Sequence, residues 1–171
     1  ELKVNPGATI IYNLISSKAV PEVISENGGT ALRSRVGHSY IKSLMAESGA
    51  IFGGEHSGHF YFGDFWRADS GMLAALYALA ELMATSKPLS NLLKPYNRYF
   101  SSGEINSKVK DAKKSINLIR EKYQGSYQVD ELDGLTITAD TWWFNLRPSN
   151  TEPLLRLNVE ANTEKQMAEI R

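Results

Sequence analysis

The segment "GGEHSGHFYF" at residues 53–62 concentrates hydrogen-bonding side chains between two apolar stretches. It contains the carboxylate of Glu55, the hydroxyl of Ser57 and the imidazoles of His56 and His59, interspersed with three glycines. A carboxylate can accept two hydroxyl hydrogens at once, and a serine hydroxyl donates or accepts. Glycines let the backbone approach a ligand closely. This set of groups suits the neighbouring hydroxyls of a sugar.

Two other interpretations of this segment stay open. Glutamate and histidine are also metal ligands, although side chains at positions i, i+1 and i+4 of an extended loop do not converge easily. The loop could instead serve the fold alone, because an isolated surface glutamate or histidine is usually just solvated.

A second group of polar residues lies in "NLRPSNTEPLLRLNVEA" at residues 145–161. The guanidinium of Arg147 can pair with two phosphate oxygens in a fork. The side chains and amides of a tight turn can bind the remaining oxygens, here at Ser149, Asn150 and Thr151. The alternative is an ordinary hairpin turn flanked by prolines. The sequence contains no P-loop or dinucleotide fingerprint.

A third polar stretch is "RSRVGHSYIK" at residues 33–42. Arg33 and Arg35 alternate on one face of a predicted strand, and His38 begins a predicted helix. A histidine at this position is more often a structural or capping residue than a ligand. The aromatic residues in Trp66-Arg67 and Trp142-Trp143 are expected to lie in the core or at an interface and to have no role in chemistry.

Alternating strands and helices position these groups in the first half of the chain. We predict strands at 9–15, 30–36 and 50–54 and helices at 17–29, 38–48 and 68–86, with Asp69 or Ser70 as the last N-cap. This order predicts βαβ units and a largely parallel sheet. Ligands of such sheets bind beyond the carboxyl ends of the strands, which is where Glu55 would lie.

The pattern changes near residues 87–104, where prolines, serines and Gly103 indicate a boundary. We therefore predict two domains, at 1–95 and 96–171. The second is predicted to contain a helix at 108–123 and strands at 126–132, 135–140, 142–147 and 154–160. Asp133-Gly134 between the first two strands is a strong hairpin signal, so this half is expected to be an α+β domain on an antiparallel sheet.

The composition excludes several classes of protein. Nineteen basic and nineteen acidic residues cancel, which argues against a general binder of nucleic acid or membrane surfaces. The absence of cysteine excludes disulfides and thiolate metal sites. The longest apolar run, 72–84, is interrupted by Glu81 and is too short to span a bilayer. With no signal-like start, we expect a cytoplasmic protein, and both ends look cut from a longer chain.

Three motifs occur in an order and spacing typical of one family: "VGHSYIK" at 36–42, "GGEHSGHFYF" at 53–62 and "RPSNTEPLLRLNVEA" at 147–161. With them the sequence resembles the α-D-phosphohexomutase family, and within it the phosphomannomutase/phosphoglucomutase branch, almost end to end. Members have four domains, and this chain resembles the third and fourth. The resemblance implies an α/β domain with a βαβ mixed sheet, like domain 3 of phosphoglucomutase, then a small α+β antiparallel-sheet domain, TATA-box-binding-like, with its C-terminus truncated.

The resemblance also implies roles for individual residues. Glu55 and Ser57 would hold sugar hydroxyls, and His38 matches a histidine that lines the sugar site. His59 matches one proposed to help move protons. The phosphate that is not being transferred would be gripped by the residues of the second motif, namely Arg147, Ser149, Asn150 and Thr151. Some members carry a lysine where this chain has Ile15, and Lys18 or Arg35 would have to substitute for it.

The implied activity moves a phosphoryl group between the 1- and 6-hydroxyls of a hexose, through a phosphoserine and a hexose 1,6-bisphosphate. The serine loop and the Mg²⁺ loop belong to domains not found here, since no "SHNP"-like or "DGDGDR"-like segment exists. We therefore expect no metal ligand in this chain, a Mg²⁺ site in the missing N-terminal half, and no activity from the fragment alone.

The branch is indicated by two positions. The glucosamine branch typically has glycine in place of Asn150 and glutamine in place of His56. We expect a phosphomannomutase fragment that acts on mannose phosphates, with phosphoglucomutase or phosphoglucosamine mutase as alternatives. A non-catalytic sugar-phosphate binding module and a structural domain that lost its ligand are the hypotheses from other classes.

Overall fold

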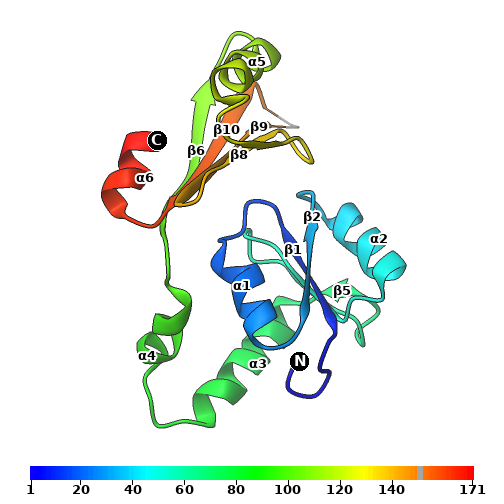
Figure 1. Ribbon diagram of the computed structural model, residues 1–171. Helices are drawn as coiled ribbons and strands as arrows, with labels where there is room; N and C mark the ends of the chain where they lie inside the picture. Colours follow the sequence, from blue (N-terminus) through cyan, green and yellow to red (C-terminus); the bar gives the residue numbers. More distant parts are fainter. Residues whose placement is uncertain (150–151) are drawn as a thin grey trace. The chain divides into compact units, whose positions relative to one another are not determined.

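The computed structural model describes residues 1–149 and 152–171, and it divides into two compact units, Glu1–Arg98 and Tyr99–Arg171 (Figure 1). The composition placed the boundary between residues 95 and 96. Asn150 and Thr151, two of the predicted phosphate ligands, lie outside the described residues. No helix of the described residues is long and apolar enough to cross a membrane.

The first unit contains a five-stranded mixed sheet of order β2-β1-β3-β4-β5. Its strands are β1 (Thr9–Asn13), β2 (Thr30–Ser34), β3 (Phe52–Gly54), β4 (Phe60–Phe62) and β5 (Ala68–Asp69). β1 pairs in parallel with both β2 and β3, whereas β4 and β5 add antiparallel strands. The predicted α/β mixed-sheet domain is confirmed, with the parallel part limited to the first three strands.

Two ends of the helices in this unit coincide with capping residues of the sequence, at Gly49 and Ser70. The helices are α1 (Ala19–Glu26), α2 (His38–Ser48), α3 (Gly71–Met83) and α4 (Leu89–Leu93), followed by a 3₁₀ turn at Lys94–Tyr96. Gly49 ends α2 in the left-handed conformation at φ 68°, which glycine adopts at little cost. The Ser70 hydroxyl accepts a hydrogen bond from Leu73 N at 3.2 Å, so Ser70 is the N-cap of α3.

The sheet lies between helices because successive strand residues point to opposite faces. Ile11 of β1 packs with Ile41 and Met45 of α2, all three at most 1% exposed. The preceding residue, Ile10, lines a hollow on the other face together with Val23 of α1. Full burial of each such side chain contributes about 1.5–3 kcal/mol, which fixes α2 over the ends of β1 and β3.

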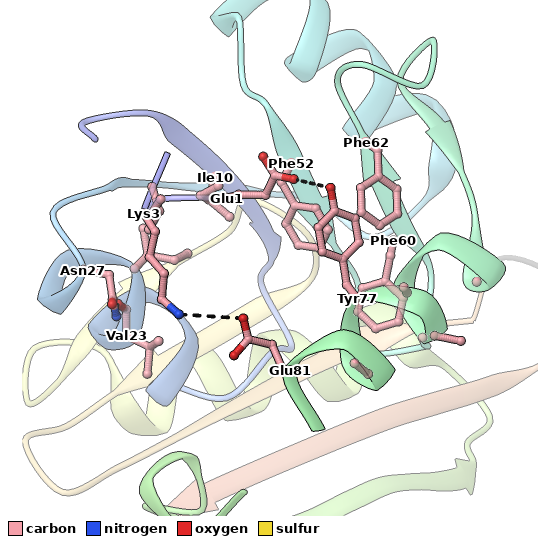
Figure 2. A pocket seen from close by; sticks show the side chains of 17 residues that line it. Glu1, Lys3, Ile10, Val23, Asn27, Phe52, Phe60, Phe62, Tyr77 and Glu81 are labelled. Atoms are coloured by element: carbon pink, nitrogen blue, oxygen red, sulfur yellow. Dashed lines mark hydrogen bonds and ion pairs between the residues drawn. The ribbon is translucent and has the colours of Figure 1, made fainter. Parts of the chain in front are cut away.

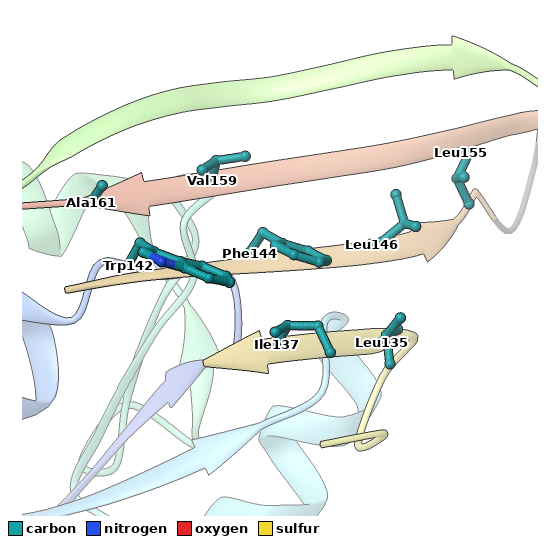
Figure 3. Close-up of a cluster of buried hydrophobic side chains, with 8 residues drawn as sticks. All are labelled: Leu135, Ile137, Trp142, Phe144, Leu146, Leu155, Val159 and Ala161. Atoms are coloured by element: carbon teal, nitrogen blue, oxygen red, sulfur yellow. The ribbon is translucent and has the colours of Figure 1, made fainter. Parts of the chain in front are cut away.

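The second unit is an α+β domain on a five-stranded antiparallel sheet of order β6-β10-β9-β8-β7. Its elements are β6 (Phe100–Lys108), α5 (Ala112–Tyr123), β7 (Gln128–Asp130), β8 (Leu135–Thr138), β9 (Trp142–Pro148), β10 (Leu154–Ala161) and α6 (Glu164–Ile170). Alternate residues of β8 and β9 form the core, as Figure 3 shows for Ile137, Phe144 and Leu146. Ile116 and Ile119 of α5 pack against this cluster.

Two expectations were wrong, and two strands were not predicted. Residues 100–108 form the strand β6 rather than a linker and a helix start, because pairing with β10 outweighs the weak strand propensity of its serines and Gly103. The helix therefore starts later, at Ala112. Strands β4 and β5 were not predicted, since both are very short. Of the aromatics expected in the core or at an interface, Trp142 is in the core at 9% exposure, and Trp66 is 84% exposed.

Candidate functional site

The carboxyl ends of the parallel strands meet at one edge of the first unit. β1 ends at Asn13, which is fully buried, and β3 ends at Gly54, directly before Glu55. The Asn13 Oδ1 atom lies within hydrogen-bonding distance of Ser16 Oγ, at 2.8 Å, and of His56 N, at 3.4 Å. The turn at residues 55–59 is closed by hydrogen bonds from Glu55 N to His59 O and from Gly58 N to Glu55 O. The start of the turn at residues 55–59 is therefore tied to the end of β1.

Glu55 is only 6% exposed, and two hydrogen-bond donors hold its carboxylate. The Tyr61 hydroxyl donates to Glu55 Oε1 at 2.6 Å, and Gly37 N, at the start of α2, donates to Glu55 Oε2 at 3.1 Å. A buried carboxylate is tolerated when hydrogen bonds satisfy it, and the N-terminus of a helix favours negative charge. The carboxylate is thus fixed in orientation.

Tyr61 also sets the tautomer of His38. Burial, followed by the hydrogen bond to Glu55, raises the pKa of the fully buried Tyr61 hydroxyl far above its usual value, so the hydroxyl keeps its proton. That one proton goes to Glu55, while His38 Nδ1 lies 2.6 Å from the same oxygen. His38 Nδ1 must therefore donate to Tyr61, and in the neutral imidazole Nε2 carries the lone pair.

His59 has a carboxylate partner of its own. Its Nδ1 lies 2.6 Å from Asp69 Oδ2, and Phe60 N donates to Asp69 Oδ1 at 2.9 Å. Burial raises the pKa of Asp69, but the hydrogen bonds from His59 and Phe60 outweigh it, so the pKa lies below its ordinary value and the carboxylate is ionised. The rings of His38 and His59 are 4.4 Å apart at 67°.

The structure brings three of the predicted sugar-site residues together: Glu55, His38 and His59. Ser57 is exposed at the tip of the same turn. Glu55 presents fixed acceptor oxygens, and imidazole is the side chain that exchanges protons near neutral pH. This arrangement can bind hydroxyl groups and move a proton between them. Sequence reasoning missed Tyr61 and Asp69, whose signal was only their place in an aromatic run and at a helix start.

The predicted phosphate turn lies at the end of β9. Arg147 is 7% exposed, and its Nη2 lies 3.2 Å from Glu104 Oε2. Arg156, the cross-strand partner of Arg147 on β10, donates to Ser149 Oγ at 3.2 Å and lies 3.5 Å from Glu104 Oε1. Two arginines therefore share one carboxylate beside Ser149.

Sequence reasoning missed Glu104 and Arg156. Counting outward from the turn would have paired Arg156 with Arg147, because opposite residues of an antiparallel hairpin lie on one face. Nε of Arg147 and of Arg156 is buried without a hydrogen-bond partner among the described residues.

Lys18 and Arg35 are the residues expected to substitute for the lysine that some phosphohexomutases carry. Ile15, which stands at that position, is a core residue at 6% exposure. The Arg35 guanidinium stacks 4.4 Å over the ring of Tyr40, and Lys18 lies at the N-cap of α1.

A hollow of about 760 Å³ in the first unit is lined mainly by apolar side chains of the sheet, α1 and α3 (Figure 2). Among the lining residues, the Tyr77 hydroxyl donates a hydrogen bond to Glu1, and Lys3 forms an ion pair with Glu81. None of the predicted sugar-site residues lines it. A second hollow of about 470 Å³ does border Glu55 and His56.

The one group of three potential metal ligands among the described residues does not match the preferences of Mg²⁺. Across residues 1–149 and 152–171, one group of three potential ligands occurs, His38, His59 and Asp69, whose ligand atoms lie within 4.8 Å of one another. Mg²⁺ demands octahedral coordination, mostly by oxygen, whereas this group offers two nitrogens and one carboxylate. This group of three residues therefore suits Mg²⁺ poorly.

Known protein families and individual proteins match this chain along nearly its whole length. The family profile "Phosphoglucomutase/phosphomannomutase, alpha/beta/alpha domain III" matches residues 1–99, and "Phosphoglucomutase/phosphomannomutase, C-terminal domain" matches residues 104–171. A phosphomannomutase of Methanocaldococcus jannaschii is 49% identical over 168 residues, which cover 98% of this chain and 37% of that protein. A phosphomannomutase of Escherichia coli strain K12 is 40% identical over 172 residues, covering 99% and 38%.

Solved structures extend the comparison to the fold. A phosphoglucomutase/phosphomannomutase family protein from Burkholderia thailandensis matches with a TM-score of 0.85 at 33% identity, covering 99% of this chain and 36% of that chain. An N-acetylphosphoglucosamine mutase from Aspergillus fumigatus, in complex with glucose 1,6-bisphosphate, shares the fold with a TM-score of 0.67 at 10% identity, covering 96% and 37%.

The two profile matches together cover nearly all of the chain, which spans little more than a third of the length of the relatives. The chain belongs to the phosphoglucomutase/phosphomannomutase family and corresponds to its domain III and C-terminal domain.

Proposed function

We propose that this chain is the sugar- and phosphate-recognising part of a phosphomannomutase, which interconverts mannose 6-phosphate and mannose 1-phosphate. The observation that carries the proposal is the buried Glu55 carboxylate, oriented by Tyr61 and Gly37 beside His38. The relatives named phosphomannomutase support the choice of substrate.

In this proposal Glu55 and Ser57 bind the hydroxyls of the hexose. Each Glu55 oxygen keeps a lone pair beyond its bond to Tyr61 or Gly37, so the carboxylate can accept two sugar hydroxyls. His38 lines the site with Nε2 free, and His59, backed by Asp69, exchanges a proton with the reacting hydroxyl. If the bound hydroxyls are O3 and O4, glucose fits as well as mannose, and phosphoglucomutase activity is the second candidate.

Arg147, Ser149, Asn150 and Thr151 are proposed to clamp the phosphate that is not being transferred. A hexose 1,6-bisphosphate intermediate must present either of its two phosphates to this clamp. A guanidinium that forks onto oxygens suits both orientations, since it reads charge and planarity rather than the sugar. Arg156 adds a second cation, and Glu104 holds both guanidiniums in place when phosphate is absent.

The serine nucleophile and the Mg²⁺ loop are proposed to reside in the domains that the relatives have beyond this match. Bound Mg²⁺ would supply neutralisation of the developing phosphate charge. The 171-residue chain alone is therefore expected to bind sugar phosphates without converting them. A non-catalytic binding module is the alternative, and a whole protein carrying both loops would exclude it.

The missing domains are also the proposed partner of helix α3. No residue of α3 is buried, and it exposes Met72, Leu76, Leu79 and Met83 at 53–86%. A helix that is apolar on all sides normally lies inside a larger protein. Since the chain covers 37–38% of the relatives, the remaining domains are available to cover this helix.

The test is a titration followed by ¹⁵N NMR, with mannose 1-phosphate, glucose 1-phosphate, free mannose and inorganic phosphate. We expect the sugar phosphates to shift the amide signals of 53–59 and of 147–149, and inorganic phosphate to shift only the latter. If every phosphate ligand shifts only the signals of 147–149, this segment binds anions in general and the chain does not recognise the sugar. If no ligand shifts either segment, recognition by this chain is excluded.

A further inference from the structure

The two histidines and Asp69 that line the sugar site also match the ligand set of a zinc site. His38 begins α2, His59 precedes β4 and Asp69 ends β5, yet one potential ligand atom from each lies within 4.8 Å of the others. We propose that these three residues bind a divalent transition-metal ion of the Zn²⁺ class, and that the metal competes with the sugar phosphate.

The donor set selects for such ions. Two imidazoles and one carboxylate, with a fourth position left to water, form a common open zinc site. Imidazole nitrogen favours Zn²⁺, Cu²⁺ and Ni²⁺, whereas Mg²⁺ and Ca²⁺ favour oxygen alone. The chain contains no cysteine, so no thiolate of this chain competes for the metal.

The outer hydrogen bonds of these residues are those that metal sites use. Tyr61, itself bound to Glu55, occupies Nδ1 of His38 and leaves Nε2 for a metal. Phe60 N occupies Oδ1 of Asp69 and leaves Oδ2 toward His59. Partners of this kind fix the tautomer and the orientation of metal ligands.

The adjustments needed are small. His59 Nδ1 and Asp69 Oδ2 are 2.6 Å apart, and ligand atoms about 2.1 Å from a tetrahedral zinc ion lie about 3.4 Å from one another. The direct contact must therefore open by less than one ångström, and no other pair has to close from more than 4.8 Å. His38 is an exposed residue, and the side chains of His59 and Asp69 are 40% and 30% exposed, so shifts of this size do not disturb the core.

Metal and sugar phosphate exclude each other because both need the same imidazoles. This second step rests on the proposed function, whereas binding of the metal itself does not. Zinc would thus inhibit the complete enzyme through a site separate from that of its catalytic Mg²⁺, which we expect outside this chain.

The test is calorimetric titration of the 171-residue chain with ZnCl₂, together with the visible absorption of added Co²⁺. We expect one saturable site that MgCl₂ does not fill. Loss of an outer hydrogen-bond partner weakens metal binding by about 10–100-fold, so Tyr61→Phe should weaken Zn²⁺ binding by about tenfold. His38→Gln, His59→Gln and Asp69→Asn each remove a ligand and should weaken it by more than that range. The matched control is His56→Gln, an exposed histidine outside the group, which should bind as the parent does.

Equal loss of affinity in His56→Gln and His59→Gln, unchanged binding in Asp69→Asn, or no saturable Zn²⁺ binding would each overturn the metal site. A ¹⁵N–¹H spectrum of each variant shows whether it is folded, and the conservative Asp69→Asn and Tyr61→Phe changes decide the matter if a glutamine variant is not. Competition is measured separately, as the fold by which saturating Zn²⁺ raises the Kd for mannose 1-phosphate. If mannose 1-phosphate binds and Zn²⁺ leaves its Kd unchanged, only the competition is overturned; if it does not bind at all, the proposed function fails and the metal titration still stands.

Discussion

The phenol oxygen of Tyr61 lies 2.6 Å from Oε1 of Glu55, and both side chains are buried. Tyr61 lies on β4 and Glu55 directly after β3, two strands that pair antiparallel with Gly53 opposite Tyr61. The hairpin therefore delivers the hydroxyl to the carboxylate. Because the hydroxyl has one proton, the same contact dictates which nitrogen of His38 is protonated.

We predict that Tyr61→Phe changes the tautomer of His38. The variant leaves Glu55 Oε1 without its donor and His38 Nδ1 without its acceptor, so the imidazole proton no longer prefers Nδ1 over Nε2. Long-range ¹⁵N–¹H NMR should show the Nδ1–H form in the parent and a mixture, or mainly Nε2–H, in the variant. The unsatisfied buried carboxylate should lower the free energy of unfolding by about 1–3 kcal/mol.

The control for this change is Tyr77→Phe, which removes a hydroxyl that bonds the exposed Glu1. It should alter neither the tautomer nor the stability by a measurable amount. An Nε2–H tautomer of His38 in the parent protein would contradict the assignment of the Tyr61 proton to Glu55.

Because Arg147 is proposed to clamp the phosphate, Arg147→Ala should weaken binding of inorganic phosphate or mannose 1-phosphate. A charge-assisted hydrogen bond contributes about 1.5–3 kcal/mol, and Arg147 is buried enough to avoid most solvent screening. Calorimetry measures the loss. Arg120→Ala removes another ion-paired arginine of the same unit and should leave phosphate affinity unchanged, and so an equal loss in both variants would remove Arg147 from the clamp.

Glu104→Gln tests whether this carboxylate competes with phosphate for the two arginines. Its oxygens lie 3.2 Å and 3.5 Å from Arg147 and Arg156, and a partly exposed ion pair of this kind contributes up to about 1 kcal/mol. Neutralising the carboxylate should therefore raise phosphate affinity by up to about fivefold, with a steeper dependence on salt. Weaker phosphate binding by Glu104→Gln would mean that Glu104 mainly orients the guanidiniums.

The ion pair between Arg98 and Glu26 has a definite pH dependence. The hydrogen bond from Arg98 lowers the pKa of Glu26 despite a small opposing effect of desolvation. A group with a lowered pKa in the folded state stabilises it above the unfolded pKa, and this contribution is lost as the pH falls through the folded pKa. The tie between residue 98 and α1 should therefore loosen in acid.

A ¹³C titration of the Glu26 carboxyl measures this effect. In Arg98→Gln the pKa of Glu26 should rise toward its ordinary value, and in Arg120→Gln it should stay low, because Arg120 pairs with Glu131 instead. A Glu26 pKa that is the same in the parent and in Arg98→Gln would show that the ion pair does not persist in solution.

Sequence patterns predicted the helix that carries His38 with both of its ends, 38–48, because glycines flank it on either side. They also predicted that a loop follows β3 directly, since glycines restrict where a strand can end. They did not predict the partners of the histidines. Tyr61 and Asp69 face each other across β4 and β5, and this register comes from tertiary pairing rather than from the local residues.

The strand β6 was missed for a related reason. Its sequence, FSSGEINSK, has few of the residues that favour strands, and it is an edge strand held by β10 alone. Glu104 lies on this strand, so its place beside Arg147 could not be predicted either. Residues whose role depends on strand pairing were thus the ones that the sequence concealed.

Gly134 in the β7–β8 turn shows how backbone geometry limits substitution. Its φ is +72°, and a Cβ atom there would lie 2.5 Å from Leu146 O. Gly134→Ala should lose about 1–2 kcal/mol from the left-handed conformation and about 1–3 kcal/mol more from the overlap. The tryptophans at 142 and 143 report the unfolding of this unit in urea by fluorescence. Gly125→Ala is the matched control, because Gly125 has φ +86° with nothing within 4 Å, so it should lose only the conformational part. Equal losses in the two variants would show that β9 moves away from the turn at no cost.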